Sequence, residues 1–236
     1  MQTTWMFLAT PAMALIAACG SDSKKSTPDA LKIVDSPVVT IDAPPACNIS
    51  SPDFGDLGTV AMGFSSYSPG MAANGLPAAP LVSMNAALSA ATPPDVVFVD
   101  FFSGFTPFGT EAAPTAAVPG TYQLTGEQLQ FSSCGVCVTA AAKIVQGGGN
   151  GGDFMATGGT VTITTNGAAV GGTLAIELSN VTFEQATFNM GVSTPVGNGC
   201  NTKLTKLVYS GMMVAPSAKP GNPGQRTTVK LTRNSL

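Results

Sequence analysis

The chain has 236 residues, of which 44% are hydrophobic and only 10% are charged, against about 25% charged residues in an average soluble domain. Its net charge of -3 lacks the positive surplus of a nucleic-acid-binding protein, so no nucleic-acid partner is expected. The absence of histidine excludes His-based triads, His metal sites and His general bases. Neither a Gly-x-Ser-x-Gly nucleophile elbow nor a phosphate-binding loop occurs, and no cofactor is expected.

The first 18 residues have the layout of a lipoprotein signal peptide. Trp5–Ala18 is an uncharged apolar run of 14 residues, too short for a bilayer core, which needs about 20. It ends in Ile16-Ala17-Ala18-Cys19, which resembles a bacterial lipobox. We therefore expect Cys19 to be acylated, palmitate included, and to become the mature N-terminus. An ordinary signal peptide cleaved at an Ala-x-Ala site is the alternative.

Residues 19–46 are predicted to form the lipidated cysteine and a flexible linker. Gly20–Ala46 is rich in Ser, Asp, Lys and Pro, and such a segment cannot bury enough apolar surface to fold. Gly20, rather than Asp, follows the cysteine, which in enteric-type sorting favours the outer membrane. We expect an exported lipoprotein on the periplasmic or surface face of that membrane, with its folded domain at residues 47–236.

From Cys47 onward the pattern is that of strands. Thr160–Thr164 and Thr173–Leu178 alternate polar and apolar residues, as half-buried strands do. Leu81–Ala91 has helical propensity and is left open as a short helix. Many short strands with Gly and Pro turns predict an all-β domain, an antiparallel β-sandwich or jelly roll. The other predicted strands are Gly58–Phe64, Asp95–Phe102, Gly120–Leu124, Leu129–Val138, Thr139–Val145, Val181–Glu184, Leu204–Ser210 and Thr227–Thr232.

Once Cys19 is assigned to lipid, four cysteines remain, and two disulfides are expected among Cys47, Cys134, Cys137 and Cys200. Residues i and i+3 of a strand lie about 10 Å apart, whereas bonded cysteines need Cα atoms within about 7 Å. A direct Cys134–Cys137 bond therefore needs a turn, which Gly135 permits. The strand context favours the alternative, in which each of the two bonds to Cys47 or Cys200. It also argues against a redox CxxC motif, which uses a helix N-terminus, and against a four-cysteine zinc site.

Carboxylates are the remaining candidates for catalysis. A glycosidase holds two of them about 5–9.5 Å apart. Asp95 and Asp100 lie five residues apart on one predicted strand, so about 16 Å should separate them, on opposite faces. Asp53 and Asp56 are typical of turns. No catalytic pair is predicted.

Gly148–Met155 fits a single copy of the calcium β-roll pattern, which makes Asp153 a weak metal candidate. That motif pools carboxylates from stacked copies, and one copy cannot do so. A hairpin loop is the favoured interpretation, and no metal site is predicted.

Charge is uneven along the domain, because residues 185–236 carry six cations and no acid. A basic patch for anionic headgroups or glycans is one interpretation. The favoured one is that these residues offset acids on neighbouring strands. The cations are Lys203, Lys206, Lys219, Arg226, Lys230 and Arg233.

Several stretches between residues 119 and 200 carry a resemblance. They are Pro119–Leu124, the CGxC element at Cys134–Cys137, the GTxT element at Gly159–Thr162, LSNVTF at Leu178–Phe183 and Ser193–Val196. In this order, and with the Asp-Ala-Pro tether, they resemble a group of uncharacterised predicted lipoproteins of myxobacteria. The resemblance implies an exported β-rich domain stapled by cysteines, and it carries no activity or site residues.

We therefore expect a lipid-anchored cell-envelope protein whose β-sandwich is a non-catalytic binding or structural module, with a membrane and an envelope glycan or protein as partners. An envelope hydrolase using carboxylates that the fold assembles is the alternative. Two facing carboxylates in a concave site would favour the enzyme. Exposed aromatics within Phe101–Phe108 would favour binding by stacking. They are Phe101, Phe102, Phe105 and Phe108.

Overall fold

The computed structural model describes residues 47–61, 63–72, 75–145 and 149–216. The predicted signal peptide, Cys19, the tether and the predicted strand Thr227–Thr232 lie outside the described residues. The elements are the strands β1 (Asp56–Thr59), β2 (Gly63–Ser68), β3 (Leu81–Ala87), β4 (Val96–Phe102), β5 (Gly109–Thr110), β6 (Ala113–Pro114), β7 (Gly120–Gln123), β8 (Val136–Ala142), β9 (Gly152–Asn166), β10 (Thr173–Asn189), β11 (Val192–Pro195) and β12 (Asn201–Val214), and the 3-10 helix η1 (Gly126–Leu129).

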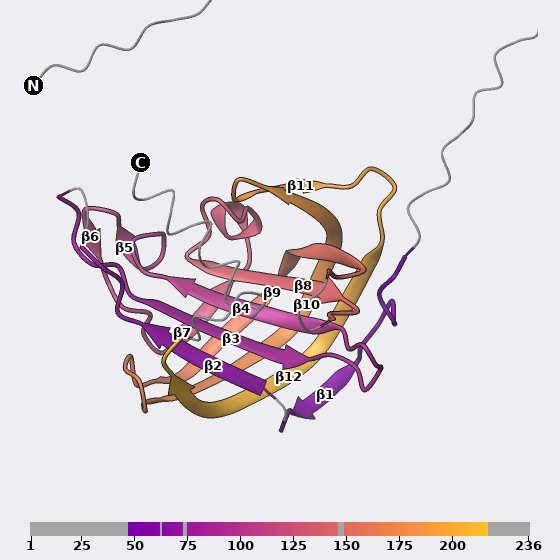
Figure 1. The fold of residues 1–236 in the computed structure, drawn as a ribbon, viewed down its shortest axis with the longest axis horizontal. Coiled ribbons are helices and arrows are strands. Elements are labelled where there is room, and N and C mark those ends of the chain that lie inside the picture. The colour runs from indigo at the N-terminus through magenta and orange to yellow at the C-terminus, as the bar shows by residue number, and fades with distance from the viewer. Residues whose placement is uncertain (1–46, 62, 73–74, 146–148, 217–236) are drawn as a thin grey trace, which may run out of the picture. The chain divides into compact units, whose positions relative to one another are not determined.

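Ten strands form one sheet, in the order β1-β12-β2-β3-β4-β8-β9-β10-β11, with β7 beside β9. Because β12 pairs with β10 along most of its length and with β2 at Met213 and Val214, the path from β2 round to β12 closes on itself. Figure 1 shows β2, β3, β4 and β8 crossing in front of β9, β10 and β12. We call the first four strands the front layer and the other three the back layer. The all-β prediction is confirmed, but the pairing joins the two layers into one sheet instead of the separate sheets of a sandwich. It is also mixed, since β12 runs parallel to β1 and β2.

The space between the layers is filled by alternate residues of the strands. In β10, Leu174, Ile176 and Leu178 are buried in the main hydrophobic cluster, while Thr173 is exposed. In β4, Val97 and Val99 belong to the same cluster. The period-two pattern of the sequence is thus the inside–outside alternation of the sheet.

Two predicted strands are not continuous, and the short helix left open for Leu81–Ala91 is not formed. Gly58–Phe64 spans the end of β1 and the start of β2. Leu81–Ala91 begins with the strand β3, whose Met84 and Ala86 enter the core between β2 and β4, so pairing overrides helical propensity. Leu129–Val138 is not a continuous strand, because η1 ends at Leu129, a turn follows, and β8 begins only at Val136.

Strand β8 differs from β10 because all seven of its residues are buried. Val136 and Val138 face the main cluster, so Cys137 and Thr139 point to the outer side of the sheet. A second cluster covers part of that side, with Phe131 and Cys134 from the segment before β8. On the outer side of the front layer, this part of the sheet is therefore covered by protein and does not face solvent.

Candidate functional site

The four cysteines of the domain form two disulfides, Cys47–Cys200 and Cys134–Cys137, with Cα–Cα distances of 5.5 and 5.2 Å. The favoured pairing of each CxxC cysteine with a distant partner is therefore wrong. The chain bends at Gly135, between the two cysteines, as a direct bond requires. A turn leads into Cys134, because the N–H groups of Ser133 and Cys134 both donate to the carbonyl of Gln130, at 3.0 and 2.9 Å.

The CxxC segment is pressed against the loop before β5. Gly135 donates its N–H to the carbonyl of Thr106 at 3.1 Å, and a Cβ at Gly135 would lie 2.3 Å from that oxygen. Only glycine fits here. On its other side, Phe102 donates to the carbonyl of Gly135 at 2.8 Å, which joins the segment to the end of β4.

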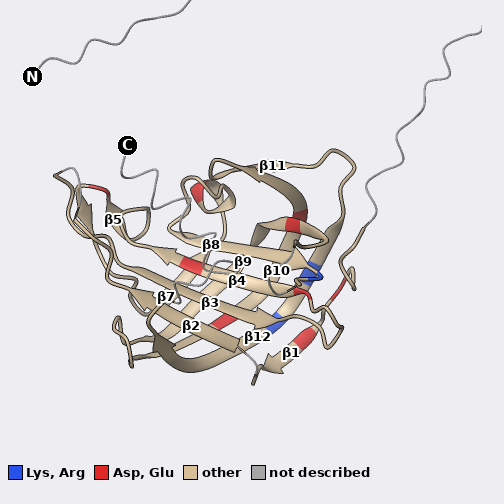
Figure 2. Cartoon of the chain, in the orientation of Figure 1, with Lys and Arg blue, Asp and Glu red and all other residues tan. Residues whose placement is uncertain are grey.

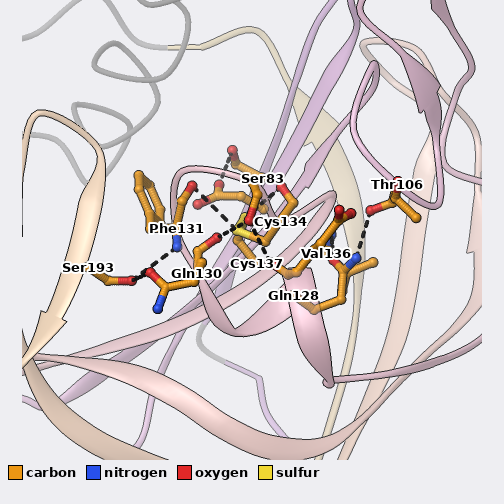
Figure 3. Close-up of a disulfide and its surroundings, with 12 residues drawn as sticks. Ser83, Thr106, Gln128, Gln130, Phe131, Cys134, Val136, Cys137 and Ser193 are labelled. Carbon is orange, nitrogen blue, oxygen red and sulfur yellow. Dashed lines mark hydrogen bonds between the residues drawn. A yellow bond between two sulfur atoms is a disulfide. The ribbon is translucent and has the colours of Figure 1, made fainter.

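Two glutamines hold the same segment through their side chains (Figure 3). The Gln128 Nε2 donates to the carbonyl of Thr106 at 2.7 Å, and its Oε1 accepts from the N–H of Val136 at 2.7 Å. The Gln130 Oε1 accepts from the hydroxyl of Ser193, which in turn accepts from the N–H of Phe131, each at 3.1 Å. Together these bonds link the segment to the loop at Thr106, to the start of β8 and to β11.

The Cys134–Cys137 disulfide lies in the interior of the domain. Both cysteines are fully buried, within the second cluster beside Phe102, Phe131 and Met155. A redox-active cysteine needs access for the attacking thiol and a setting that favours thiolate, and an apolar cluster provides neither. The prediction against redox chemistry rests now on this burial.

A polar hollow of about 380 Å³ lies between β7 and η1. Its lining residues carry hydroxyl, amide, carboxylate and phenol groups, all of which can hydrogen-bond. Gln128 is already held by its two hydrogen bonds, so that wall of the hollow is fixed. The lining residues are Thr106, Pro107, Thr121, Tyr122, Gln123, Thr125, Glu127, Gln128 and Val136.

Tyr122 forms the aromatic wall of this hollow. Its hydroxyl donates to the carbonyl of Val118 at 2.7 Å, and its ring meets Phe108 edge to face at 5.2 Å. Partial burial raises the pKa of the Tyr122 phenol, because desolvation disfavours its charged form. The ring is therefore neutral and held in place.

A larger hollow of about 540 Å³ lies at the end of β3, beside Asn85, Ser89 and Thr92. Its lining includes three alanines and no charged or aromatic side chain. It offers fewer directed groups to a ligand than the polar hollow does, so we take the polar hollow as the candidate site.

The candidate carboxylates have structural partners. Asp95 is fully buried and accepts from the backbone N–H groups of Ser50 and Lys143, at 3.1 and 3.0 Å, and from the hydroxyls of Ser50 and Ser89. It ties the start of the domain to the ends of β4 and β8. Asp100 accepts from the hydroxyl of Ser83 at 2.6 Å, on the outer side of β4. The two carboxylates share no partner among these bonds, as their spacing predicts.

The aromatic loop is mostly core. Phe101, Phe102 and Phe108 are buried, and only Phe105 is half-buried, with its ring edge-on to Phe102. Phe101 packs edge to face against Phe108 inside the main cluster. The sequence left open whether Phe101–Phe108 is core or a binding loop, and the structure places three of its four aromatic rings in the core.

Asp153 lies in β9 and accepts from the side-chain amide of Asn150 at 2.7 Å. Among the described residues, no cluster of three or more His, Cys, Asp or Glu side chains is arranged to hold a metal ion. The short bond to Asn150 fits the hairpin interpretation of this loop.

Two of the C-terminal cations offset acids on neighbouring strands, as favoured from the sequence. The Lys203 Nζ lies 3.0 Å from Asp53 and the Lys206 Nζ lies 3.2 Å from Glu177. Lys203 and the N–H of Gly55 lower the pKa of Asp53, and Ser179 and Lys206 lower that of Glu177. Figure 2 shows these few charges spread over the sheet. Lys219, Arg226, Lys230 and Arg233 lie outside the described residues.

The sequence pattern did not single out the glutamines or the polar hollow. Gln128 and Gln130 alternate with Leu129 and Phe131, which imitates a half-buried strand. The signal that could have corrected this is Gly126, which has a positive φ of 54° and starts the turn of η1.

Comparisons of the chain with protein-family models, curated proteins and solved structures found no match. In the part of the chain that the structure describes, no helix is long and apolar enough to cross a membrane.

Proposed function

We propose that the protein is a lipid-anchored component of a cell envelope, related to the myxobacterial lipoprotein group, whose β domain is a non-catalytic module that binds a hydroxyl-rich ligand such as an envelope glycan. The observation that carries the proposal is the order of the parts. An apolar run ends at Cys19, a polar Pro-rich spacer follows, and a disulfide-closed domain begins at Cys47.

The position of the first disulfide supports this layout. Cys47 is bonded to Cys200, directly before β12, the strand that closes the sheet. A force applied to the spacer is therefore transmitted through the disulfide to β12, which is hydrogen-bonded to strands on both sides. Disulfides also persist in exported proteins, because the cytosol keeps thiols reduced.

The polar hollow supports the ligand class. Its exposed residues, Thr121, Gln123, Thr125 and Glu127, offer hydroxyl, amide and carboxylate groups that can bond sugar hydroxyls. Tyr122 adds an aromatic wall for the apolar face of a sugar ring. With one carboxylate and no basic residue in its lining, the hollow fits a neutral ligand better than an anion.

The anchor is tested by metabolic labelling with a fatty acid. We expect label on the mature N-terminus, partition of the protein into detergent, and loss of both in a Cys19→Ser variant. Two acyl chains hold a domain at a membrane, whereas one is marginal. An unlabelled mature protein cleaved elsewhere would contradict the anchor.

The hollow is tested by co-sedimentation of the detergent-solubilised full protein with insoluble envelope polysaccharides, including peptidoglycan. A Thr125→Ala/Glu127→Gln variant should lose at least tenfold in affinity, since it removes two exposed groups of the lining. The matched control Thr173→Ala, at the exposed start of β10, should bind as the parent does. Equal binding by all three proteins would contradict the site.

A further inference from the structure

Strand β7 has one edge without a strand partner. β10 pairs along one side of β9, whereas β8 and β7 lie end to end along the other side, with β7 beside residues 160–163. In the part of the chain that the structure describes, β9 is the only strand that pairs with β7. β4, the next strand beyond β8, ends at Phe102, and none of the described strands continues it beside β7. The sheet therefore has a gap at the free edge of β7.

The free edge presents backbone groups to this gap. The N–H of Leu124 donates to the carbonyl of Gly159 beside β7, at 2.9 Å. Alternate residues of an antiparallel strand point their backbone groups to opposite sides, so those of Thr121 and Gln123 point away from β9. The carbonyl of Gln123 accepts from the N–H of Thr125 at 3.1 Å. The N–H and carbonyl of Thr121 and the N–H of Gln123 are left for a ligand.

These backbone groups border the polar hollow. Its lining includes Thr121 and Gln123 on one side, and Thr106 and Val136, which Gln128 joins through its two hydrogen bonds (Figure 3). The hollow therefore occupies the gap, and the wall that faces β7 is held in place. Free edges are usually protected from pairing by charged residues, proline or a bulge. β7 has none of these, and the side chains of Thr121 and Gln123 are exposed.

A short extended peptide is the complement of such an edge, because an added strand binds through main-chain hydrogen bonds. β7 has only four residues, about 13 Å of strand, which can pair with a peptide of about the same length. Directly after this edge, the exposed Thr125 and Glu127 offer a hydroxyl and a carboxylate to sugar hydroxyls. A short peptide attached to a sugar uses both parts of the hollow, whereas a long protein strand uses only the edge.

We propose that the ligand of the polar hollow is a glycan with short peptide branches, whose branch adds as a strand to the free edge of β7 while its sugar contacts Thr125 and Glu127. Peptidoglycan has this chemistry. The inference rests on the glycan site proposed above and names the class of glycan that the site selects.

The first test compares three soluble probes on the detergent-solubilised full protein. They are a peptidoglycan disaccharide with its peptide branch, the disaccharide alone and the peptide alone. The branched probe should bind about tenfold or more tightly than either part, and should lose this advantage when its peptide amides are N-methylated, which removes their donors.

The outcomes separate this inference from the proposed function. Equal binding of the disaccharide and the branched probe, or binding of none of the probes while insoluble polysaccharides still co-sediment, would overturn the peptide contact and leave the glycan site standing. Equal binding of the peptide and the branched probe would overturn the branched glycan in favour of a protein segment. Failure of the probes and the polysaccharides alike would overturn both.

The second test blocks the edge itself. Thr121→Pro removes the N–H that faces the gap and no bond to β9. Thr121→Ala is the matched control, because it lacks the same hydroxyl but keeps this N–H. Thr121→Pro should bind the branched probe about tenfold more weakly than Thr121→Ala does, and the two variants should bind the disaccharide equally. Equal binding of the branched probe by both variants would overturn the strand pairing.

A further measurement covers the case in which Thr121→Pro does not fold. Amide hydrogen exchange of Thr121 and Gln123 is followed by NMR in the parent protein. The branched probe should slow exchange at both amides about tenfold or more, and the disaccharide should not. The N–H of Leu124, which is already bonded beside β9, is the internal control and should change less. Unchanged exchange at Thr121 and Gln123 under saturating branched probe would overturn the proposal.

Discussion

Strands β8 and β10 lie in the same sheet, one strand apart, yet they are buried in different ways. In β10, Leu174, Ile176 and Leu178 enter the core, and the residues between them face outward. In β8 every residue from Val136 to Ala142 is buried. The difference comes from what lies outside the sheet: the segment before β8 folds back over that strand's outer side, held by Gln128, Gln130 and a disulfide.

The two layers are therefore held by different kinds of interaction. The back layer needs only alternating side chains and backbone pairing. The covered front layer uses a CxxC disulfide, a glycine in contact with a carbonyl, and fixed glutamine amides. The same covering segment forms one wall of the polar hollow, so the rigidity of the cover and the shape of the candidate site depend on the same residues.

The largest effect should separate the two disulfides. Removing Cys47–Cys200 as a Cys→Ala pair should lower the free energy of unfolding by about 5 kcal/mol, because this bond closes a loop with a sequence separation of 153. Removing Cys134–Cys137 in the same way should cost about 2 kcal/mol, because the separation is only 3. Urea unfolding of the mature protein measures both. Equal losses would mean that the packing of the segment over β8, and not the entropy of the unfolded chain, determines how much stability each disulfide contributes.

Next come neighbouring residues on opposite faces. In the covered strand β4, Phe101→Ala and Phe102→Ala should each cost about 3–5 kcal/mol, because both rings are buried. In β10, Phe183→Ala should cost as much, whereas the exposed Thr182→Ala, which loses a hydroxyl contact with Thr157, should cost less than about 1 kcal/mol. If Phe102→Ala were as mild as Thr182→Ala, the outer side of β4 would not be packed as the structure has it.

The sequence predicts the back layer better than the front. Thr160–Thr164 and Thr173–Leu178 alternate, and alternation is sufficient to identify a strand with one wet face. VCVTAAA in β8 does not alternate, since both of its faces are dry, and the pattern says nothing about what covers them. The predicted cysteine partners are also wrong, because the direct bond depends on a bend at Gly135, whereas the alternating residues before Cys134 predict a continuous strand. The polar hollow is built from three segments that are apart in the sequence, so no single stretch of sequence predicts it.

The stability that the segment covering β8 gives to the domain should depend on Gln128. Gln128→Met keeps the size of the side chain but removes both of its hydrogen bonds, and it leaves the buried N–H of Val136 without its acceptor. We expect a loss of about 1–3 kcal/mol in the free energy of unfolding. The matched control is Gln123→Met on β7, an exposed side chain that accepts from Thr160, with an expected change within about 0.5 kcal/mol. Equal losses in the two variants would show that the two hydrogen bonds of Gln128 do not stabilise the fold more than an exposed side chain does.

The smallest effect belongs to the back layer and concerns pH. Neighbouring groups lower the pKa values of Asp53 and Glu177 below their ordinary values of 3.8 and 4.5 in the folded protein. A depressed carboxyl pKa contributes stability that is fully present above the unfolded value and is lost as pH falls through the folded value. We therefore expect stability to decline on acidification below about pH 4.5, and an Asp53→Asn/Glu177→Gln variant to decline less steeply. Both ion pairs are exposed to solvent, so 0.5 M salt should narrow the difference between the two proteins. Glu111→Gln, which alters an acid outside the described ion pairs, should follow the parent curve. A double variant that also follows the parent curve would show that these ion pairs contribute nothing, and that the back layer is held by its pairing and its core alone.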